Sequence, residues 1–507
     1  MAMAKLAIYS NNNTIFLREI MPLLLPYTYS SHHALSFQAP MAPLFSVIVL
    51  FIIIICDSPL AHSRTTPHHI PKTTFLDVTA SIQKTLQVLD FNHHKQQEQL
   101  SSTPSSKLSL QLHSRASLQK PTHRDYKSLT LSRLERDSAR VTTLLTRSQS
   151  FSVSELEGPI VSGTSQGSGE YFSRVGIGEP PNPVYMVLDT GSDISWVQCS
   201  PCSGCYRQSD PIFDPNSSSS FHPLSCDSTH CQLLDESQCL NGNCLYEVSY
   251  GDGSYTVGEF VTETISIGQS SVTNIAIGCG HNNQGLFIGA AGLLGLGGGT
   301  LSFPAQLNST SFSYCLVDRD SDKVSTLEFD TPFPRNAVTA PLRRNSEFET
   351  FYYVGLQGIG VGGELLPIPE SLFAADPAGG IGGVIIDSGT AVTRLRREVY
   401  EWLRRAFLSG TQGLAMARGV SLFDTCYDMS SMGSVEVPTV SFHFEGGMVL
   451  TLDANSYLIP VDSVGTFCFA FAPTNSPLSI IGNVQQQGTR VSFDLANSLV
   501  GFSANSC

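Results

Sequence analysis

Two aspartates in this 507-residue chain lie in nearly the same local sequence. Residues 187–192 read VLDTGS and residues 385–390 read IIDSGT, so Asp189 and Asp387 each follow an apolar run and precede a hydroxyl residue and a glycine. A carboxylate in apolar surroundings is stable only when its oxygens find partners. Backbone N–H groups and hydroxyls of the next residues can supply those partners. The repeated motif therefore predicts two buried, hydrogen-bonded carboxylates.

The residues after each aspartate have the right chemistry for this role. Glycine lets the backbone come close, and the hydroxyls of Ser192 and Thr390 can bond the carboxylates from the side. One such motif alone would usually be an Asx-type turn that closes a hairpin. A second repeated motif favours a functional pair of aspartates over two unrelated turns. Two apolar residues and a glycine follow each aspartate about a hundred residues later: LLG at 293–295 and IIG at 480–482. We expect two homologous β lobes that each contribute one aspartate.

Two carboxylates side by side cannot both ionise easily, so they share a proton and titrate with split pKa values. The ionised partner can take a proton from water while the protonated partner donates to a substrate carbonyl. That chemistry hydrolyses an amide bond without metal, cofactor or covalent intermediate. The expected partner is a peptide or protein substrate.

The composition favours a turn-rich β protein. Hydrophobic residues make up 41% of the chain and charged residues 14%, with 42 Gly and 28 Pro. From residue 169 onward, short apolar runs alternate with Gly, Pro, Asn and Asp, which is typical of strands and turns. The better helix candidates in this part are 302–306 and 397–408. The chain is too long for one hydrophobic core.

Charge divides the chain into a basic leader and an acidic body. Residues 1–150 hold 15 Lys or Arg against 8 Asp or Glu, whereas residues 151–507 hold 14 against 35. Such an acidic body is a poor partner for nucleic acid. It suits low pH, where protonated carboxylates repel each other less. We hypothesise that the leader covers the body by charge complementarity; the alternative is a disordered Lys/Arg-rich segment.

The residues 44–56 (LFSVIVLFIIIIC) form an uncharged run that is too short to span a bilayer as a helix. We interpret 41–63 as a secretory signal peptide, with small residues at positions 61 and 63 for cleavage, and 1–40 as an upstream extension. The alternative is an uncleaved signal anchor. The prediction is entry into the secretory pathway, with transient membrane contact, and an extracellular (apoplastic) destination; the endoplasmic reticulum and the vacuole are alternatives.

Thirteen cysteines support export. Cys56 lies in the apolar run, and the other twelve follow residue 198, an even number that predicts six disulfides in an oxidising compartment. Cys199, Cys202 and Cys205 also have a metal-site spacing, but disulfides are favoured there and no metal is expected. Glycosylation sequons begin at Asn216 and Asn308.

Residues 64–150 read as a pro-segment. The stretch 126–145 has apolar residues at helical spacing, which predicts a short amphipathic helix; a solvated linker helix is the alternative. The body then divides into lobes at 151–335 and 336–507.

From Tyr171 to Cys507 the chain resembles the pepsin-like aspartic endopeptidases, in particular their plant nepenthesin-type branch. The stretch 167–181 (GSGEYFSRVGIGEPP) and the pro-segment are most similar to the plant "aspartic protease in guard cell" group. The resemblance implies an all-β, bilobal fold with the active cleft between homologous lobes, and Asp189 and Asp387 as the catalytic pair. It implies substrate-binding roles for the neighbouring residues Thr190, Gly191, Ser192, Ser388, Gly389 and Thr390.

The same resemblance makes Tyr250, in the sequence SYGDGS, the tyrosine of a flap hairpin whose tip includes Gly251 and Asp252. Trp196 then supports that tyrosine. Residues 199–244 resemble the cysteine-rich insertion of the nepenthesin-type branch. The family pattern implies six disulfides: Cys199–Cys202, Cys205–Cys279, Cys226–Cys244, Cys231–Cys239, Cys315–Cys507 and Cys426–Cys468.

The sequence thus predicts a secreted, monomeric aspartic endopeptidase made as an acid-activated zymogen. The rival prediction is a catalytically silent protein of the same fold that binds or inhibits other proteins in the cell wall. Such proteins generally have a damaged catalytic motif, and here both aspartate motifs are intact.

Overall fold

The computed structural model describes residues 70–89, 108–118, 123–147, 171–250, 254–285, 287, 289–375, 382–504 and 507. All of them belong to one compact unit, 69–507. The predicted upstream extension and signal peptide lie outside the described residues. The boundary at 335 between the two lobes stays a prediction.

Strands dominate the body, and the helices are few. The helices are α2 (Val78–Gln87), α3 (Arg115–Leu118), α4 (Tyr126–Arg147), α5 (Thr229–Gln232), α6 (Phe303–Gln306) and α7 (Arg397–Gly410). The predicted helix 126–145 is therefore present as α4, and the candidates at 302–306 and 397–408 correspond to α6 and α7. In the described part of the chain, none of the helices has both the length and the apolar character needed to cross a bilayer.

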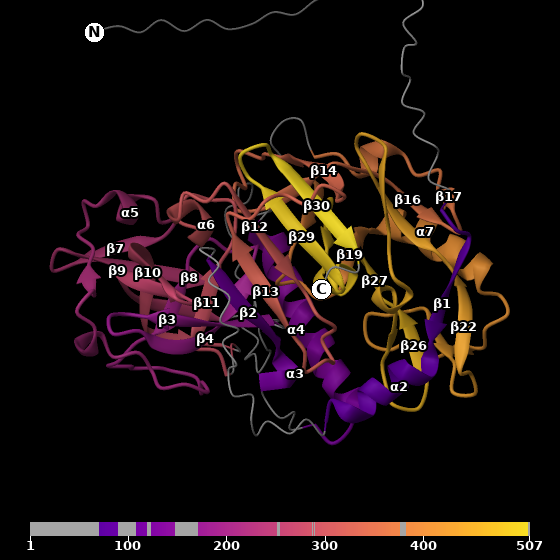
Figure 1. The fold of residues 1–507 in the computed structure, drawn as a ribbon, viewed down its shortest axis with the longest axis horizontal. Helices are drawn as coiled ribbons and strands as arrows, with labels where there is room; N and C mark the ends of the chain where they lie inside the picture. Colours follow the sequence, from indigo (N-terminus) through magenta and orange to yellow (C-terminus); the bar gives the residue numbers. More distant parts are fainter. Residues whose placement is uncertain are drawn as a thin grey trace, which may run out of the picture. The chain divides into compact units, whose positions relative to one another are not determined.

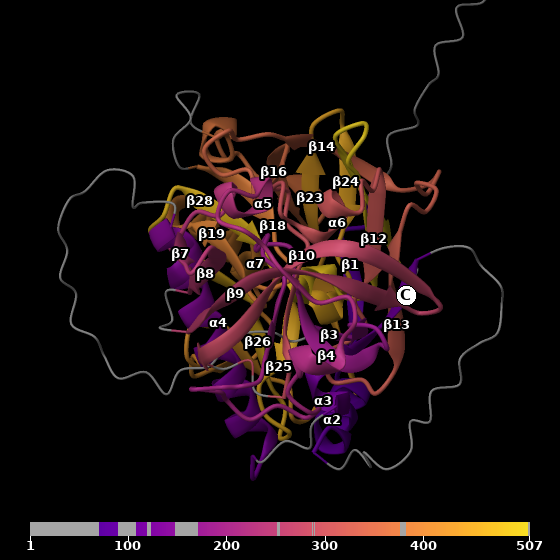
Figure 2. The same ribbon diagram turned by 90° about the vertical axis from the view of Figure 1, so that its left-hand side faces the viewer.

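The first lobe is built on a connected set of strands around a long hairpin of β9 and β10 (Figure 2). Its strands are β3 (Tyr171–Ile177), β4 (Asn182–Asp189), β5 (Trp196–Gln198), β6 (His222–Pro223), β7 (Ser237–Leu240), β8 (Asn243–Ser249), β9 (Tyr255–Ile267), β10 (Ser270–Gln284) and β11 (Gly292–Gly295).

Five strands connect the lobes: β12 (Ser311–Cys315), β13 (Val324–Phe329), β14 (Val338–Arg343), β29 (Thr489–Asp494) and β30 (Leu499–Ala504). The antiparallel pairs β12–β29, β29–β30 and β14–β30 bring the end of the chain back beside its middle. Phe493 of β29 stacks on Phe312 of β12 at a centroid distance of 4.6 Å. The resulting core is continuous between the lobes.

The second lobe carries two four-stranded sheets beside the strands that position Asp387. Its strands are β15 (Tyr352–Val354), β16 (Leu356–Val361), β17 (Glu364–Leu365), β18 (Gly383–Ile386), β19 (Thr393–Arg396), β20 (Met416–Ala417), β21 (Cys426–Asp428), β22 (Ser434–Pro438), β23 (Val440–Phe444), β24 (Met448–Thr451), β25 (Leu458–Pro460), β26 (Thr466–Phe469), β27 (Phe471–Thr474) and β28 (Leu478–Ile481).

The repeated LLG and IIG motifs explain the internal repeat. In the first lobe β11 pairs in parallel with β4, and Gly295 lies opposite Asp189. In the second lobe β28 pairs in parallel with β18, and Ile481 lies opposite Ile386, the residue before Asp387. Each apolar-apolar-Gly motif therefore flanks the strand that leads into its own aspartate, as two homologous lobes require.

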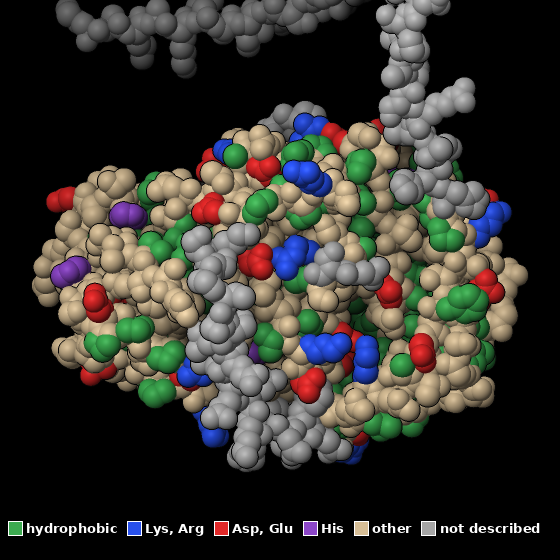
Figure 3. Space-filling model, viewed as in Figure 1, with side chains coloured by type: hydrophobic (Ala, Val, Ile, Leu, Met, Phe, Trp, Pro, Cys, Tyr) green, Lys and Arg blue, Asp and Glu red, His purple; other side chains and the backbone are tan. Residues whose placement is uncertain are grey.

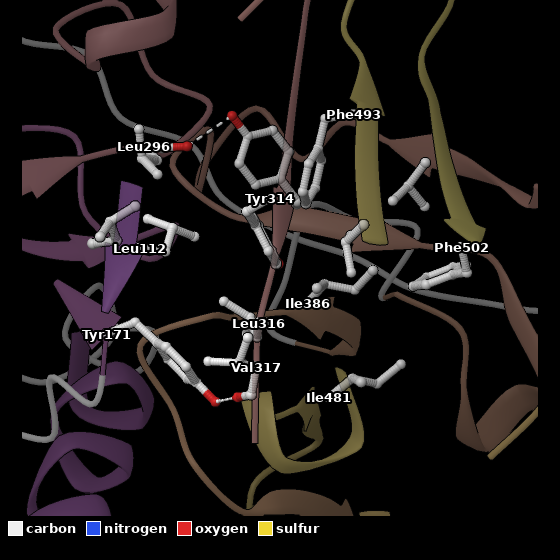
Figure 4. Close-up of a cluster of buried hydrophobic side chains, with 14 of the residues drawn as sticks. Leu112, Tyr171, Leu296, Tyr314, Leu316, Val317, Ile386, Ile481, Phe493 and Phe502 are labelled. Carbon is white, nitrogen blue, oxygen red and sulfur yellow. Dashed lines mark hydrogen bonds between the residues drawn. The ribbon is translucent and has the colours of Figure 1, made fainter. Parts of the chain in front are cut away.

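The leader contributes more than a helix. Its strand β1 (Thr73–Asp77) pairs with β22, and β2 (Ser109–Ser114) lies between β3 and β13 with antiparallel pairings to both. Leu112 of β2 is fully buried and belongs to the same core as Tyr171 and Leu316 (Figure 4). This part of the leader is integrated into the fold, which excludes the alternative of a disordered segment for the described residues.

Candidate active site

Asp189 is the last residue of β4 and is fully buried. The turn that follows bonds both of its oxygens. The backbone N–H of Gly191 donates to Oδ1 at 2.9 Å, and the hydroxyl of Ser192 donates to Oδ2 at 2.5 Å. These are the local partners that the motif predicts.

Asp387 follows β18 directly and is equally buried. The backbone N–H of Gly389 donates to its Oδ1 at 2.9 Å, and the hydroxyl of Thr390 donates to its Oδ2 at 2.5 Å. The two carboxylates thus have the same arrangement of donors, one from each lobe.

The two aspartate turns are in direct contact. The backbone N–H of Ser388 donates to the Thr190 hydroxyl at 2.9 Å, and the backbone N–H of Thr190 donates to the Ser388 hydroxyl at 3.2 Å. A Cβ on Gly389 would lie 2.5 Å from Oδ1 of Asp189, so this close approach requires glycine. The structure therefore brings together all eight of the aspartate-motif residues expected at this site.

A guanidinium from the leader joins the two carboxylates. Arg140 of α4 donates through Nη1 and Nη2 to the two oxygens of Asp189, with Nη1 at 2.9 Å from Oδ2. Its Nη2 also donates to both oxygens of Asp387, at 3.0 and 2.9 Å, and its Nε lies 3.1 Å from Oδ2 of Asp387. The Arg140 side chain is only 14% exposed, so this is a largely buried, multidentate ion pair.

The environment splits the acidities of the two aspartates. Burial favours a higher pKa for Asp189, but the charge and hydrogen bonds of Arg140, together with the bonds from Ser192 and Gly191, outweigh it and lower the pKa. Burial raises the pKa of Asp387, Arg140 opposes this, and the charge of Asp189 adds to the rise. Burial would lower the pKa of Arg140, but the two carboxylates outweigh that effect and raise it. Two neighbouring carboxylates with pKa values moved apart can act as an acid and base pair.

Helix α4 reaches this position because its apolar face docks on the body. Leu134 packs with Ala391 and Val420, whereas Val141 and Leu144 pack with a cluster that includes Ile385. Figure 1 shows α4 passing between the strands of the first lobe and those of the second. The helix therefore covers the side of the aspartate pair from which Arg140 enters.

Further ion pairs join the leader to the body. Lys84 of α2 lies 2.7 Å from Asp318, and Arg133 of α4 donates to the buried Asp320 at 2.7 Å. The hydroxyl of Tyr126 donates to the other oxygen of Asp320 at 2.5 Å. Basic leader residues thus face acidic body residues at these contacts, as the charge distribution suggested. On the face drawn in Figure 3, charged side chains are otherwise scattered among other residues and form no large patch of one sign.

One contact between leader and body has the opposite polarity. Asp137, fully buried on α4, lies 2.6 Å from Nη2 of Arg394 on β19. It also accepts the backbone N–H groups of Ala391 and Val392, at 2.6 and 3.2 Å. Sequence reasoning missed Asp137, Arg140 and Arg394. The available signal was the presence of Asp137 and Arg140 among the apolar residues of a predicted amphipathic helix.

The predicted flap tyrosine contacts the tryptophan that the resemblance assigned to it. The indole Nε1–H of Trp196, which is fully buried, donates to the hydroxyl of Tyr250 at 2.9 Å. Phe287 packs edge-on against both rings. Gly251 and Asp252, the predicted hairpin tip, lie outside the described residues.

All twelve cysteines after residue 198 form disulfides, but the pairing differs from the expected one. The bonds are Cys199–Cys279, Cys202–Cys205, Cys226–Cys239, Cys231–Cys244, Cys315–Cys507 and Cys426–Cys468. The last two were expected. Four expected pairs are wrong: Cys199–Cys202, Cys205–Cys279, Cys226–Cys244 and Cys231–Cys239.

The strand register explains the corrected pairing. Strand β10 runs parallel to β5, and the backbone N–H of Cys199 bonds the carbonyl of Gly280, so Cys199 lies beside Cys279 with a Cα–Cα distance of 5.3 Å. In the cysteine-rich insertion, Cys231 and Cys244 are both buried in the same cluster and pair with each other. The more exposed Cys226 and Cys239 form the other bond.

The remaining site predictions concern sugars and metals. Asn216 and Asn308 are both exposed, as glycosylation requires, and their modification stays a prediction. Cys199, Cys202 and Cys205 are all disulfide-bonded, which excludes the metal alternative for these three thiols. Within the described ranges no cluster of three or more His, Cys, Asp or Glu residues is arranged to hold a metal ion.

Comparison with protein families gives two adjoining matches. The model described as "Xylanase inhibitor N-terminal" matches residues 171–329, and the one described as "Xylanase inhibitor C-terminal" matches residues 351–504. Among solved structures, edgp covers 68% of the chain and 92% of its own at a TM-score of 0.56 and 20% identity. Conglutin gamma from lupine seeds covers 66% and 92% at 0.53 and 22%. At these identities the structures show a shared fold alone.

Relatives that are closer in sequence carry protease names. The protein named ASPARTIC PROTEASE IN GUARD CELL 2 from Arabidopsis thaliana is 49% identical over 82% of this chain and 91% of its own length. Aspartyl protease family protein 2 from the same plant is 54% identical over 74% and 81%. Aspartic proteinase nepenthesin-1 from Nepenthes gracilis is 42% identical over 67% and 79%. Together with the bilobal β fold, these similarities show that the chain belongs to the nepenthesin-type branch of the plant aspartic proteases and is an aspartic-type endopeptidase.

Proposed function

We propose that the chain is the precursor of a secreted aspartic endopeptidase, which becomes active when acid releases helix α4 from the aspartate pair. The observation that carries the proposal is the position of Arg140, which binds both Asp189 and Asp387. A peptide carbonyl and an attacking water would need the same carboxylate oxygens. The precursor with α4 in place is therefore expected to be inactive.

In the proposed mechanism, Asp189 and Asp387 hold one proton between them after α4 leaves. The ionised carboxylate takes a proton from a water molecule, and the protonated one donates to the substrate carbonyl oxygen. The water oxygen bonds the carbonyl carbon, which gives a tetrahedral diol. Its carbon–nitrogen bond then breaks as the amine nitrogen takes the proton that the first carboxylate received, and one diol hydroxyl returns its proton to the other carboxylate. The matched donors around the two carboxylates, from Gly191 and Ser192 on one side and from Gly389 and Thr390 on the other, support this pairing, and neither step needs a metal or cofactor.

Acid release follows from the chemistry of the leader contacts. The Arg140, Arg133 and Lys84 ion pairs hold the leader only while their carboxylate partners are ionised. Protonation removes the charge attraction that offsets the cost of burying these groups. The six disulfides and the predicted signal peptide support passage through the secretory pathway. We propose the apoplast as the destination and a monomer as the active form.

The rival function is that of a catalytically silent binding or inhibitor protein. The descriptions of the two family models favour it, since both name a xylanase inhibitor. Against it stands the complete set of donors around both aspartates. A non-catalytic protein has no need for such matched carboxylates.

Conservative substitutions of the aspartates test the proposal. Leader-free Asp189→Asn and Asp387→Asn should each lower kcat for a peptide by about 10²–10⁴-fold, because each removes one partner of a general acid–base pair. Thermal unfolding should change little, and the exposed Asp235→Asn serves as the matched control. Wild-type turnover by either Asp189→Asn or Asp387→Asn would overturn the mechanism. Xylanase inhibition by a protein that cleaves no peptide would favour the rival.

A further inference from the structure

The buried carboxylate of Asp137 occupies a binding site made entirely by the body. Three donors converge on it: Nη2 of Arg394 at 2.6 Å and the backbone N–H groups of Ala391 and Val392. Among the described residues, Asp137 is the one carboxylate within salt-bridge distance of Arg394. When α4 leaves, these three donors lose that partner together.

The body holds Arg394 in place without the leader. Its Nη1 donates to the carbonyl of Val392 at 2.9 Å, and its backbone lies in β19 opposite Ile480 of β28. The guanidinium is therefore anchored by contacts that remain after α4 is removed. The site is preorganised for a carboxylate, because the cost of fixing the donors is met by the fold itself.

The position of Arg394 places this site beside the catalytic pair. Arg394 follows Asp387 by the same number of residues as Trp196 follows Asp189, and both lie opposite the first residue of the repeated apolar-apolar-Gly motif, Ile480 or Leu293. Trp196 contacts the predicted flap tyrosine, Tyr250. Because Arg394 is the counterpart of Trp196 in the internal repeat, it belongs to the equivalent side of the predicted cleft in the second lobe. Asp137 also precedes Arg140 by three residues, which puts both on one helix face. Helix α4 thus binds the Arg394 site through Asp137 and the aspartate pair through Arg140 at the same time.

We propose that Arg394 and the amides of Ala391 and Val392 form a substrate subsite for a carboxylate side chain, which Asp137 occupies in the precursor. The mature enzyme should then prefer peptides with Asp, or less well Glu, at one fixed position near the cleaved bond. The inference rests on the proposed function, since it requires that α4 leaves and that peptides enter. An arginine this buried is costly without an anionic partner, so an acidic substrate restores an interaction that a neutral one cannot.

A series of paired peptides tests the subsite. Leader-free enzyme, obtained by acid activation of the full-length chain, is assayed at pH 5, where an Asp with its ordinary pKa of about 3.9 is ionised. Each pair contains Asp or its neutral isostere Asn at one of the positions on either side of the cleaved bond of an otherwise neutral peptide. At one position the Asp peptide should have a kcat/KM about 10-fold or more above that of the Asn peptide, as expected for a charge-assisted hydrogen bond.

Variants of Arg394 identify the residue responsible. Arg394→Gln should abolish the Asp preference, so that the ratio of kcat/KM for the Asp peptide to that for the Asn peptide falls to about one, because the charge interaction is lost. Arg394→Lys should keep part of the preference, and Arg394→Glu should transfer it to a Lys peptide. Arg405→Gln, at an exposed ion pair with Glu401, is the matched control and should behave as the wild type.

The outcomes separate this proposal from the function on which it rests. If the wild-type enzyme cleaves the neutral peptide but every Asp-to-Asn ratio stays near one, the subsite is overturned and the protease function stands. A preference that survives in Arg394→Gln also overturns it. If leader-free wild-type enzyme cleaves no peptide, both fail. The wild-type ratios test the subsite even if a variant does not fold.

Discussion

Thr190 and Ser388, one from each aspartate turn, hold the two halves of the aspartate pair together. The Ser388 backbone N–H donates to the Thr190 hydroxyl at 2.9 Å, and the Thr190 backbone N–H donates to the Ser388 hydroxyl at 3.2 Å. Both residues are almost fully buried. This reciprocal pair sets the separation of Asp189 and Asp387, which a shared proton requires.

Thr190→Val should therefore destabilise the protein and impair catalysis together. The substitution keeps the shape of the side chain but leaves the buried Ser388 N–H without its acceptor, a loss of about 1–3 kcal/mol in the free energy of unfolding. Urea unfolding of the precursor measures the loss, and kcat of the leader-free form should fall as well. The exposed Thr451→Val is the control. A change within about 0.5 kcal/mol, typical of surface substitutions, would speak against the role of this contact.

Removing the Arg140 guanidinium should relieve the proposed inhibition of the precursor. Arg140→Leu loses every bond to Asp189 and Asp387 while keeping an apolar stem on the buried face of α4. The uncleaved precursor should then hydrolyse a peptide at a pH where the wild-type precursor is silent. Lys127→Leu, an exposed residue of the same helix, should leave the precursor silent. Equal activity of the Arg140 variant and the wild type would show that α4 does not block the site through Arg140.

The pH of activation should depend on Asp320. Burial favours a higher pKa for this carboxyl, but the charges of Arg133 and Arg319 outweigh it and lower the pKa below its ordinary value of 3.8. A carboxylate whose pKa is lowered stabilises the bound leader fully at a pH above the ordinary pKa of the carboxyl group. This stabilisation is lost as the pH falls through the lowered pKa. The pKa of Asp189 is also lowered, so the ionised form of this carboxyl stabilises the bound leader in the same way. The attraction between the leader and these two carboxylates is therefore expected to be lost only at a pH below their ordinary pKa of 3.8.

Asp320→Asn abolishes this ion pair at every pH. The pH at which half of the leader is released should move toward neutrality by roughly one unit, which corresponds to about 1.4 kcal/mol of lost interaction. Gel analysis of the precursor after incubation across the pH range gives the midpoint. Asp235→Asn should leave the midpoint unchanged. An unshifted midpoint in Asp320→Asn would remove this pair from the release mechanism.

The bond from Trp196 to Tyr250 should couple the two residues energetically. Tyr250→Phe leaves a buried indole N–H without its acceptor, so the free energy of unfolding should fall by about 1–3 kcal/mol. Unfolding of Tyr250→Phe, Trp196→Phe and the double variant gives the coupling energy, expected at about 0.5–3 kcal/mol. Strictly additive effects would mean that the tyrosine is not held through this bond.

The sequence predicted the aspartate site well because its partners are local. Gly191, Ser192, Gly389 and Thr390 lie within three residues of their aspartates, so the motif itself contains the donors. The matching LLG and IIG motifs then indicated that two such turns belong to equivalent lobes. The parallel pairing of these motifs with the aspartate strands supplies the physical basis of the repeat.

The leader contacts could not be predicted in the same way. Apolar spacing predicted α4 and its buried face, but Arg140 and Asp387 are separated by 247 positions in the chain and no local pattern links them. Strands β1 and β2 were also missed. Their pairing depends on the edges offered by β22, β3 and β13, which exist only after the body has folded.

The disulfides show the same limit. Cysteine count and compartment correctly predicted six bonds, and Cys426–Cys468 joins directly opposed residues of β21 and β26. In the insertion, however, several pairings have similar separations along the chain. Strand register and burial decide among them, and neither is visible in the spacing of the cysteines.

Hydrolysis by the purified full-length precursor tests the central claim most directly. Denatured globin is incubated with it from acid to neutral pH, with and without pepstatin, while mass spectrometry follows the leader. We predict cleavage only at acid pH, blocked by pepstatin and accompanied by loss of the segment that carries Arg140. A folded, leader-free protein that cleaves nothing at any pH would contradict the account.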